Sequence, residues 1–181
     1  FRADGVLLLN RRDYPAYMQS LAKISDTDIR GLSTLEEALV RRLDDFAEEG
    51  CRFADVGIPY FPHGPGSREA AERAFQAALL GREIADADFD AFLWQMYRFL
   101  GEQYRKRNLV MQWHLAVCRN VNTALYQEVG PDSGGDCIGD VLPGSRIAAM
   151  LDAIQRDGDL PETILYTLNP AMLSQLCAVA G

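Results

Sequence analysis

Residues 109–140 read LVMQWHLAVCRNVNTALYQEVGPDSGGDCIGD, a segment that opens with an apolar run and closes with a glycine-rich turn. Its first nine residues have the length of a β-strand and are apolar except for Gln112 and His114. Because these two are two positions apart, a strand places them on the same face. Arg119 follows in a segment dense in Arg, Asn and Asp. A polar face near the end of an apolar strand, followed by such a loop, is typical of functional sites in α/β proteins.

Strand-like segments alternate with amphipathic helical segments along the rest of the chain. Apolar runs predict strands over residues 53–56, 110–117 and 163–168. Helical spacing predicts helices over residues 13–25, 67–80, 86–107, 145–156 and 171–180. A further helix begins at Ser33, which stands at capping-box spacing from Glu36, and Gly50 suits its C-terminal end. This alternation favours an α/β fold of parallel βαβ units, with adjacent strands and helices packed outside them.

The composition is that of an acidic globular protein. The chain has 181 residues, a formal net charge of −8 and a pI near 4.7. This charge argues against a nucleic-acid groove or an anionic membrane surface as partner, whereas a few arginines suffice to attract an anionic sugar to one pocket. No apolar run reaches the length of a membrane helix, no signal peptide is visible, and the four cysteines lack zinc-site spacing. We therefore expect a cytoplasmic protein with reduced thiols.

Several short motifs carry a resemblance to a known family. They are FRAD at 1–4, ADVGI at 54–58, MQWH at 111–114, RNVNT at 119–123, GPDSG at 130–134, IGD at 138–140 and LPETILYTLNP at 160–170. In this order they resemble the motifs of uronate isomerase, a family of the amidohydrolase superfamily of (β/α)8 barrels. The resemblance covers the whole chain, and several motifs in family order are more specific than any one of them.

The departures from the family pattern define the expected fold. The family's His-x-His pair on its first barrel strand, its late tryptophan strand and its last-strand Asp-x-Arg do not occur here. A closed barrel typically needs about 250 residues. We therefore expect residues 1–181 to be the central part of the enzyme, a partial (β/α)8 TIM barrel made of middle strands with additional helices. A helical insertion is expected at about 67–107. Val56 stands where the family often has His, which bears on the preference between epimers.

The resemblance implies an aldose–ketose isomerase acting on uronates. The reaction interconverts D-glucuronate with D-fructuronate, and D-galacturonate with D-tagaturonate, by proton transfer through an enediol or enediolate. Matching positions imply catalytic roles for Asp55 and His114 and substrate-binding roles for Arg2 and Arg119. The residue types suit this chemistry, because a guanidinium binds a carboxylate through two hydrogen bonds and proton transfer needs a positioned base. All four fall at strand ends or in the loops after them, so one barrel mouth would gather them.

The resemblance also implies a divalent metal, zinc or manganese, in the complete enzyme. With two histidines and no His-x-His, this chain is expected to supply none of its main ligands, and only His114 and Asp55 could approach it. The isolated chain is therefore expected to be inactive. The expected partners are the uronate substrate, the remainder of its own polypeptide and further copies in a homo-oligomer. The glycine-rich segment 130–136 is expected to be a structural turn.

Two other functions remain open at this point. One is a different metal-dependent enzyme of the amidohydrolase superfamily acting on another anionic substrate, although the RNVNT and GPDSG motifs count against it. The other is a non-enzymatic helical interaction domain that uses the aromatic-rich helix over residues 86–107 as its binding face. That alternative leaves the strand motifs unexplained.

Overall fold

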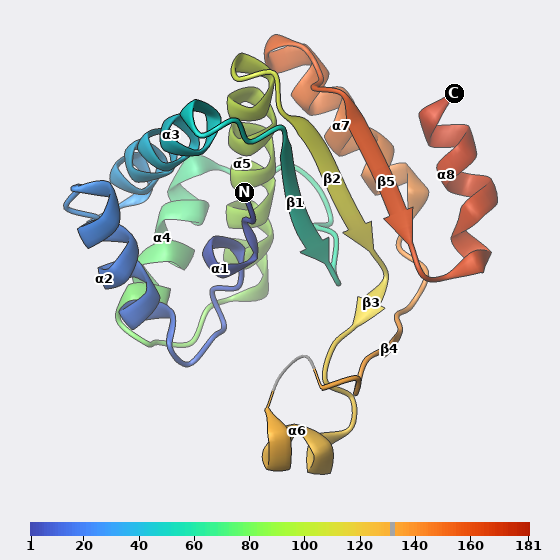
Figure 1. Cartoon of the computed structure of the whole chain (residues 1–181), viewed down its shortest axis with the longest axis horizontal. Helices are drawn as coiled ribbons and strands as arrows, with labels where there is room; N and C mark the ends of the chain where they lie inside the picture. The colour runs from blue at the N-terminus through green and yellow to red at the C-terminus, as the bar shows by residue number, and fades with distance from the viewer. Residues whose placement is uncertain (131–132) are drawn as a thin grey trace.

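A three-stranded parallel sheet forms the centre of the molecule (Figure 1). The computed structural model describes residues 1–130 and 133–181. The strands are β1 (Phe53–Ile58), β2 (Val110–Leu115) and β5 (Thr163–Thr167), in the order β1-β2-β5. Both neighbouring pairs are parallel. The predicted α/β fold with three adjacent parallel strands is confirmed, and a purely helical interaction domain does not account for this sheet.

Helices connect the strands and cover one side of the sheet. Their bounds are α1 (Asp4–Leu7), α2 (Tyr14–Ser25), α3 (Leu32–Glu48), α4 (Arg68–Leu79), α5 (Asp86–Lys106), α6 (Thr123–Val129), α7 (Gly144–Gly158) and α8 (Leu173–Ala180), with a 3-10 turn η1 (Pro170–Met172) before α8. The longer predicted helices are confirmed, whereas the short α1 and α6 were not predicted. Figure 1 shows α5 and α7 behind the strands. None of the helices in the described part of the chain combines the length and apolarity needed to cross a membrane.

The predicted capping box at the start of α3 is wrong. The helix starts one residue earlier, after an extended Gly31, so Ser33 is already inside it. The Thr34 hydroxyl accepts the Gly31 N–H at 3.0 Å, and the Glu72 carboxylate accepts the Leu32 N–H at 2.8 Å. Two of the free N–H groups at this helix start are therefore satisfied, one of them by a neighbouring helix. Ser33 and Glu36 instead accept hydrogen bonds from Arg68, at the start of α4.

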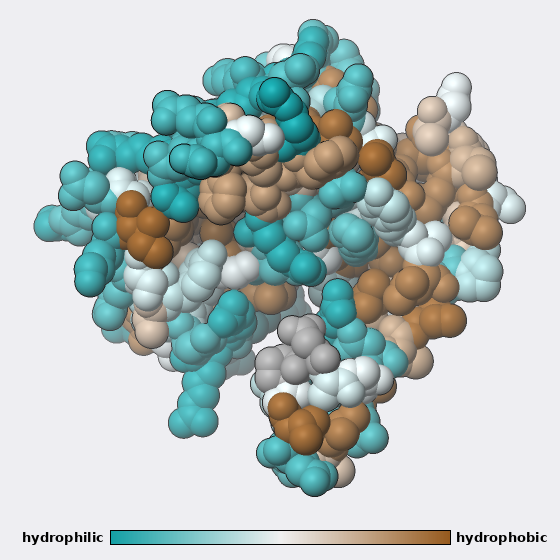
Figure 2. All heavy atoms as spheres, in the orientation of Figure 1, coloured by the Kyte–Doolittle hydropathy of each residue, from teal (hydrophilic) through white to brown (hydrophobic). Residues whose placement is uncertain are grey.

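The two faces of the sheet differ sharply in burial. On the covered face the buried side chains are Ala54, Val56, Ile58, Met111, Trp113 and Leu115. Trp113 lies between Phe61, with ring centroids 5.5 Å apart, and Tyr97 of α5, at 5.8 Å. Among the described residues, no helix covers the opposite face. Figure 2 looks onto that open face, where hydrophilic surface over the strands is flanked by hydrophobic surface beside β5 and α8.

A kink at Ala116 ends the second strand of the sheet. The predicted strand over residues 110–117 is therefore interrupted, because Ala116 adopts a positive φ of 58°. The chain then forms β3 (Val117–Cys118), which pairs antiparallel with β4 (Cys137–Ile138). We call residues 117–138 the arm. Figure 1 shows the arm leaving the body of the molecule and carrying α6 near its end.

The base of the arm is fastened to the sheet. The Gly139 N–H donates to the Ala116 carbonyl at 2.8 Å, and the Asn169 amide donates to the Gly139 carbonyl at 2.9 Å. A Cβ on residue 139 would lie 2.9 Å from the Ala116 carbonyl carbon, so this approach requires glycine. The turn predicted over residues 130–136 lies partly outside the described residues, at positions 131 and 132.

The burial difference between the two faces generates a stability prediction. Trp113→Ala removes a side chain that is 1% exposed and leaves a cavity, so the free energy of unfolding should fall by about 3–5 kcal/mol. Phe53→Ala removes an aromatic ring that is 51% exposed on the open face, and the expected change is below about 1 kcal/mol. Urea denaturation of both variants measures the difference. Equal losses would show that the two faces are buried alike.

Candidate functional site

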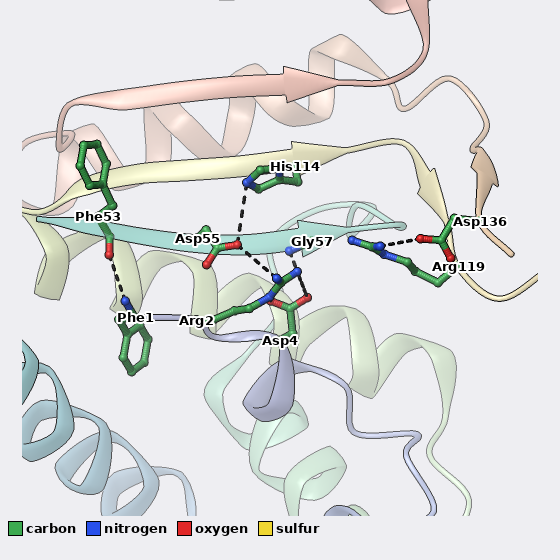
Figure 3. A network of polar contacts seen from close by, with 9 residues as sticks. All are labelled: Phe1, Arg2, Asp4, Phe53, Asp55, Gly57, His114, Arg119 and Asp136. Carbon is green, nitrogen blue, oxygen red and sulfur yellow. Dashed lines mark hydrogen bonds and ion pairs between the residues drawn. The ribbon is translucent and has the colours of Figure 1, made fainter. Parts of the chain in front are cut away.

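Arg2, Asp55 and His114 form one polar group on the open face of the sheet (Figure 3). Oδ2 of Asp55 lies 3.7 Å from Nη1 of Arg2 and 3.8 Å from Nε2 of His114. One carboxylate oxygen therefore faces a guanidinium on one side and an imidazole on the other. The sequence predicted all three residues as site residues, and the fold brings these three together.

Backbone pairing across three adjacent segments positions this group. Arg2 forms an isolated parallel bridge with Asp55, in which the Asp55 N–H donates to the Phe1 carbonyl at 2.9 Å and the Ala3 N–H donates to the Asp55 carbonyl at 3.2 Å. In β1 and β2, Asp55 is directly opposite Gln112, and His114 lies two residues further along. Because side chains of a strand alternate between faces, Asp55, Gln112 and His114 all project from the open face.

Asp4 is a fourth member of the group, and the sequence analysis did not single it out. Its carboxylate accepts two hydrogen bonds from Arg2, at 3.0 Å from Nε and 3.4 Å from Nη2, and a third from the Gly57 N–H at 3.2 Å. The guanidinium of Arg2 is thus held between the carboxylates of Asp4 and Asp55. The presence of Asp4 in the FRAD motif was the available signal, but the contact of Asp4 with Gly57 could not be predicted from sequence spacing.

Tyr166 of β5 supports His114 from the next strand. Its ring stacks on the imidazole with centroids 4.7 Å apart and an interplanar angle of 13°, and the Gln112 amide donates to its hydroxyl at 2.9 Å. His114 and Tyr166 are register partners, which explains why the rings lie side by side. The sequence analysis placed Tyr166 in a strand but gave it no role, since register between distant strands is not visible in one sequence.

Arg119 lies in a separate ion pair at the base of the arm. Its Nη1 is 2.5 Å from Oδ2 of Asp136, while the Asn120 N–H donates to Oδ1 at 2.9 Å. These two contacts, that of the Asn120 N–H first, hold the pKa of the Asp136 carboxyl below its ordinary value. Among the contacts described for Arg119, none is with Asp55 or His114. The predicted convergence of all four residues on one concave mouth therefore stays a prediction.

The site residues are partly exposed, which affects how their charges interact. The side chain of Arg2 is 55% exposed and that of His114 is 39% exposed, against 26% for Asp55 and 24% for Asp4. Water screens ion pairs at such exposure, and each contributes little to folding. A group of charges that stabilises the fold so weakly can exchange partners at low cost, as ligand binding requires.

A metal ion would find few ligands here. Within the described ranges, no group of three or more His, Cys, Asp or Glu side chains could hold one. Asp55 and His114 offer two donors 3.8 Å apart, but the guanidinium of Arg2 lies beside the same carboxylate oxygen and would repel a cation. The donor set therefore fits at most an outer contact to a metal held mainly by other residues.

Comparison with known proteins identifies the relatives of this chain. A family model described as glucuronate isomerase matches residues 1–181. The uronate isomerase of Caldanaerobacter subterraneus is 35% identical over 181 residues, which is all of this chain and 39% of that protein. The uronate isomerase of Shouchella clausii is 34% identical over 181 residues, again all of this chain and 38% of the relative. The chain thus spans about two fifths of the length of these relatives.

Two solved structures share the fold. The crystal structure of uronate isomerase from Thermotoga maritima matches with a TM-score of 0.86 at 24% identity, over 99% of this chain and 39% of that one. The crystal structure of glucuronate isomerase from Caulobacter crescentus matches with a TM-score of 0.81 at 26% identity, over 96% of this chain and 36% of that one.

The ion pair at the base of the arm generates a prediction on proton affinity. Arg119→Ala removes one of the two contacts that lower the pKa of Asp136 and leaves the Asn120 N–H in place, so this pKa should rise toward its ordinary value. Protonation of Asp136 as the pH falls would then begin at higher pH. Carboxyl ¹³C NMR titration measures the shift. Arg2→Ala is the control and should leave the Asp136 titration unchanged. An unchanged curve in Arg119→Ala would show that the pair does not persist in solution.

Proposed function

This chain belongs to the glucuronate isomerase family, and we propose that a polypeptide of its relatives' length containing it is an aldose–ketose isomerase of uronates. The reaction would interconvert D-glucuronate with D-fructuronate and D-galacturonate with D-tagaturonate. The observation that carries this proposal is the Arg2–Asp55–His114 group, in which a cation, a carboxylate and an imidazole meet on one open sheet face. These are the groups that moving a proton within an anionic sugar requires.

Asp55 and His114 are the proposed catalytic residues. Isomerisation takes a proton from the carbon next to the carbonyl and returns it to the neighbouring carbon, while the oxygens exchange a proton. A carboxylate can accept the first proton, and an imidazole can donate to the oxygen on which negative charge develops. The 3.8 Å between Oδ2 of Asp55 and Nε2 of His114 is suited to groups that act on adjacent atoms of one substrate. Tyr166 would keep the imidazole plane nearly parallel to its own ring.

Arg2 and Arg119 are the proposed substrate-binding residues. A planar guanidinium binds a carboxylate through two charge-assisted hydrogen bonds, and the uronate carboxylate is the anionic group to be recognised. Arg119 contacts Asp136 through Nη1, and its remaining N–H groups have no partner within the part of the chain that the structure describes. Arg2 lies beside the catalytic carboxylate, where its charge would also stabilise a developing oxyanion.

We propose that the sheet is part of a (β/α)8 barrel and that residues 1–181 are its central part. The polar open face would line the barrel interior, and both edges of the sheet carry apolar cavities that further strands and helices could fill. One cavity, of about 640 Å³, lies beside β5 and α8. The other, of about 320 Å³, lies beside Phe1, α2 and α3. The connection from β1 to β2 holds two helices, α4 and α5, and together they span the proposed helical insertion at about 67–107.

The proposal includes a divalent metal, zinc or manganese, to which these residues make at most an outer contact. When bound, such an ion would supply Lewis-acid polarisation of a substrate oxygen. Asp55 and His114 could face it, but its main ligands would come from residues outside this chain. A cytoplasmic location, assembly into a homo-oligomer and docking to the remainder of the polypeptide likewise stay predictions.

The activity proposal is tested on a polypeptide of the relatives' length that contains this chain, with glucuronate and galacturonate in a coupled assay. His114→Ala and Arg119→Ala should each lower kcat/KM by about a hundredfold or more, because a positioned donor is lost. His63→Ala is the matched control, since this other histidine is held by Tyr60 and Asp90 outside the group and its loss should leave turnover near normal. Near-normal kinetics in His114→Ala would assign that residue a structural role.

The chain of 181 residues tests the metal assignment. If the main ligands lie elsewhere, calorimetric titration of this chain with Zn²⁺ or Mn²⁺ should give no tight one-to-one binding, because about three converging protein ligands are needed. Uronate turnover by the same sample should be absent. A tight stoichiometric site that Asp55→Asn abolishes would place the metal among these residues instead.

A further inference from the structure

The antiparallel strands at the base of the arm place two cysteines opposite each other. Cys118 of β3 and Cys137 of β4 are direct register partners. Both are free thiols and both are exposed. The other two cysteines lie on separate parts of the fold, Cys51 before β1 and Cys177 in α8. Cys118 and Cys137 are therefore a preformed pair, and neither the resemblance nor the proposed activity uses them.

The geometry of an antiparallel pair suits a disulfide. Residues directly opposite each other project from the same face, and their Cα atoms are about 4.5–5.5 Å apart. Disulfides occur at Cα separations of about 4.4–6.8 Å. The Cα separation therefore lies within the disulfide range. The Cβ atoms of opposite residues, about 4.5–5.5 Å apart, must approach to about 3.5–4.5 Å, so forming the bond requires a small shift of the two strands. The hydrogen bond from Gly139 to Ala116 continues the same pairing toward the sheet and holds the two strands together.

We propose that Cys118 and Cys137 form a dithiol modification site that is oxidised to a cross-strand disulfide by a low-molecular-weight disulfide such as glutathione disulfide. One cysteine thiolate attacks a sulfur of glutathione disulfide, which forms a mixed disulfide and releases one glutathione thiolate. The second cysteine thiolate then attacks the protein sulfur of the mixed disulfide and releases the second glutathione. The two thiol protons pass to the two released glutathiones. The protein loses two electrons, and glutathione disulfide is reduced by two.

The position of the site gives the bond a structural effect. Arg119 follows Cys118 and Asp136 precedes Cys137. The ion pair between Arg119 and Asp136 therefore links the two chain segments next to the cysteines. A disulfide would fix the base of the loop that carries α6 and would restrict the freedom of Arg119 to leave Asp136. This proposal concerns thiol chemistry alone and holds whether or not the uronate isomerase activity is found.

The test is equilibration of the chain in glutathione redox buffers, followed by acid quenching, alkylation of the remaining thiols and mass spectrometry. The expected product has lost two hydrogens and gives a cross-linked peptide pair containing Cys118 and Cys137. The Cys51→Ser/Cys177→Ser double variant is the matched control and should form the same bond. Cys118→Ser and Cys137→Ser should each bind one glutathione on the cysteine that remains in the arm.

A comparison with the unfolded chain separates the effect of the fold from that of loop length, since Cys118 and Cys137 are also the closest cysteines in sequence. In the double variant, the equilibrium constant for disulfide formation should be at least about tenfold larger in native buffer than in concentrated urea, because the strands raise the effective concentration of one thiol at the other. Equal constants in the two conditions would overturn the proposal. Stable glutathione adducts on both arm cysteines of the wild-type chain would also overturn it.

Discussion

The burial of Trp113 decides which way His114 points. Successive side chains of a strand alternate between its two faces, so packing Met111, Trp113 and Leu115 against the helices forces Gln112 and His114 onto the opposite face. The same alternation in β1 buries Ala54 and Val56 and turns Asp55 outward. A slip of one residue in either strand would bury the polar residues and expose the apolar ones. The hydrophobic effect thus sets the geometry of the polar group, although no member of that group contributes to the core.

Period-two and helical patterns made the main elements predictable, and they also predicted that Gln112 and His114 share a face. The long helices were predictable because each buries a broad apolar side. Other features depend on contacts between residues far apart in sequence. At the start of α3, the Leu32 N–H donates to Glu72, which belongs to a different helix. Tyr166 reaches His114 only through the register of β5 on β2, and a single sequence carries no record of that register.

The family resemblance extended the prediction where physical patterns gave little signal. Arg2 is one charged residue close to the first residue of the chain, and no periodicity marks it. Its place beside Asp55 comes from a single backbone bridge. Arg119 was named by the resemblance in the same way, and its role stays a prediction, but its position differs, because the structure pairs it with Asp136 at the base of the arm. The positive φ of Ala116 explains the difference: the chain leaves the sheet there, before Arg119 is reached.

The fastening of the arm at Ala116 and Gly139 has a consequence for how such a protein can change. The arm leaves and rejoins the sheet at two residues joined by a 2.8 Å hydrogen bond, so it is a loop whose two ends are held together. Lengthening such a loop costs little, about 0.6 kcal/mol for each doubling of its length. None of the residues of α6 is buried, so none is tied to the core. The fold should therefore tolerate insertions and grafted peptides within residues 124–129, which makes this part of α6 suitable for engineered tags.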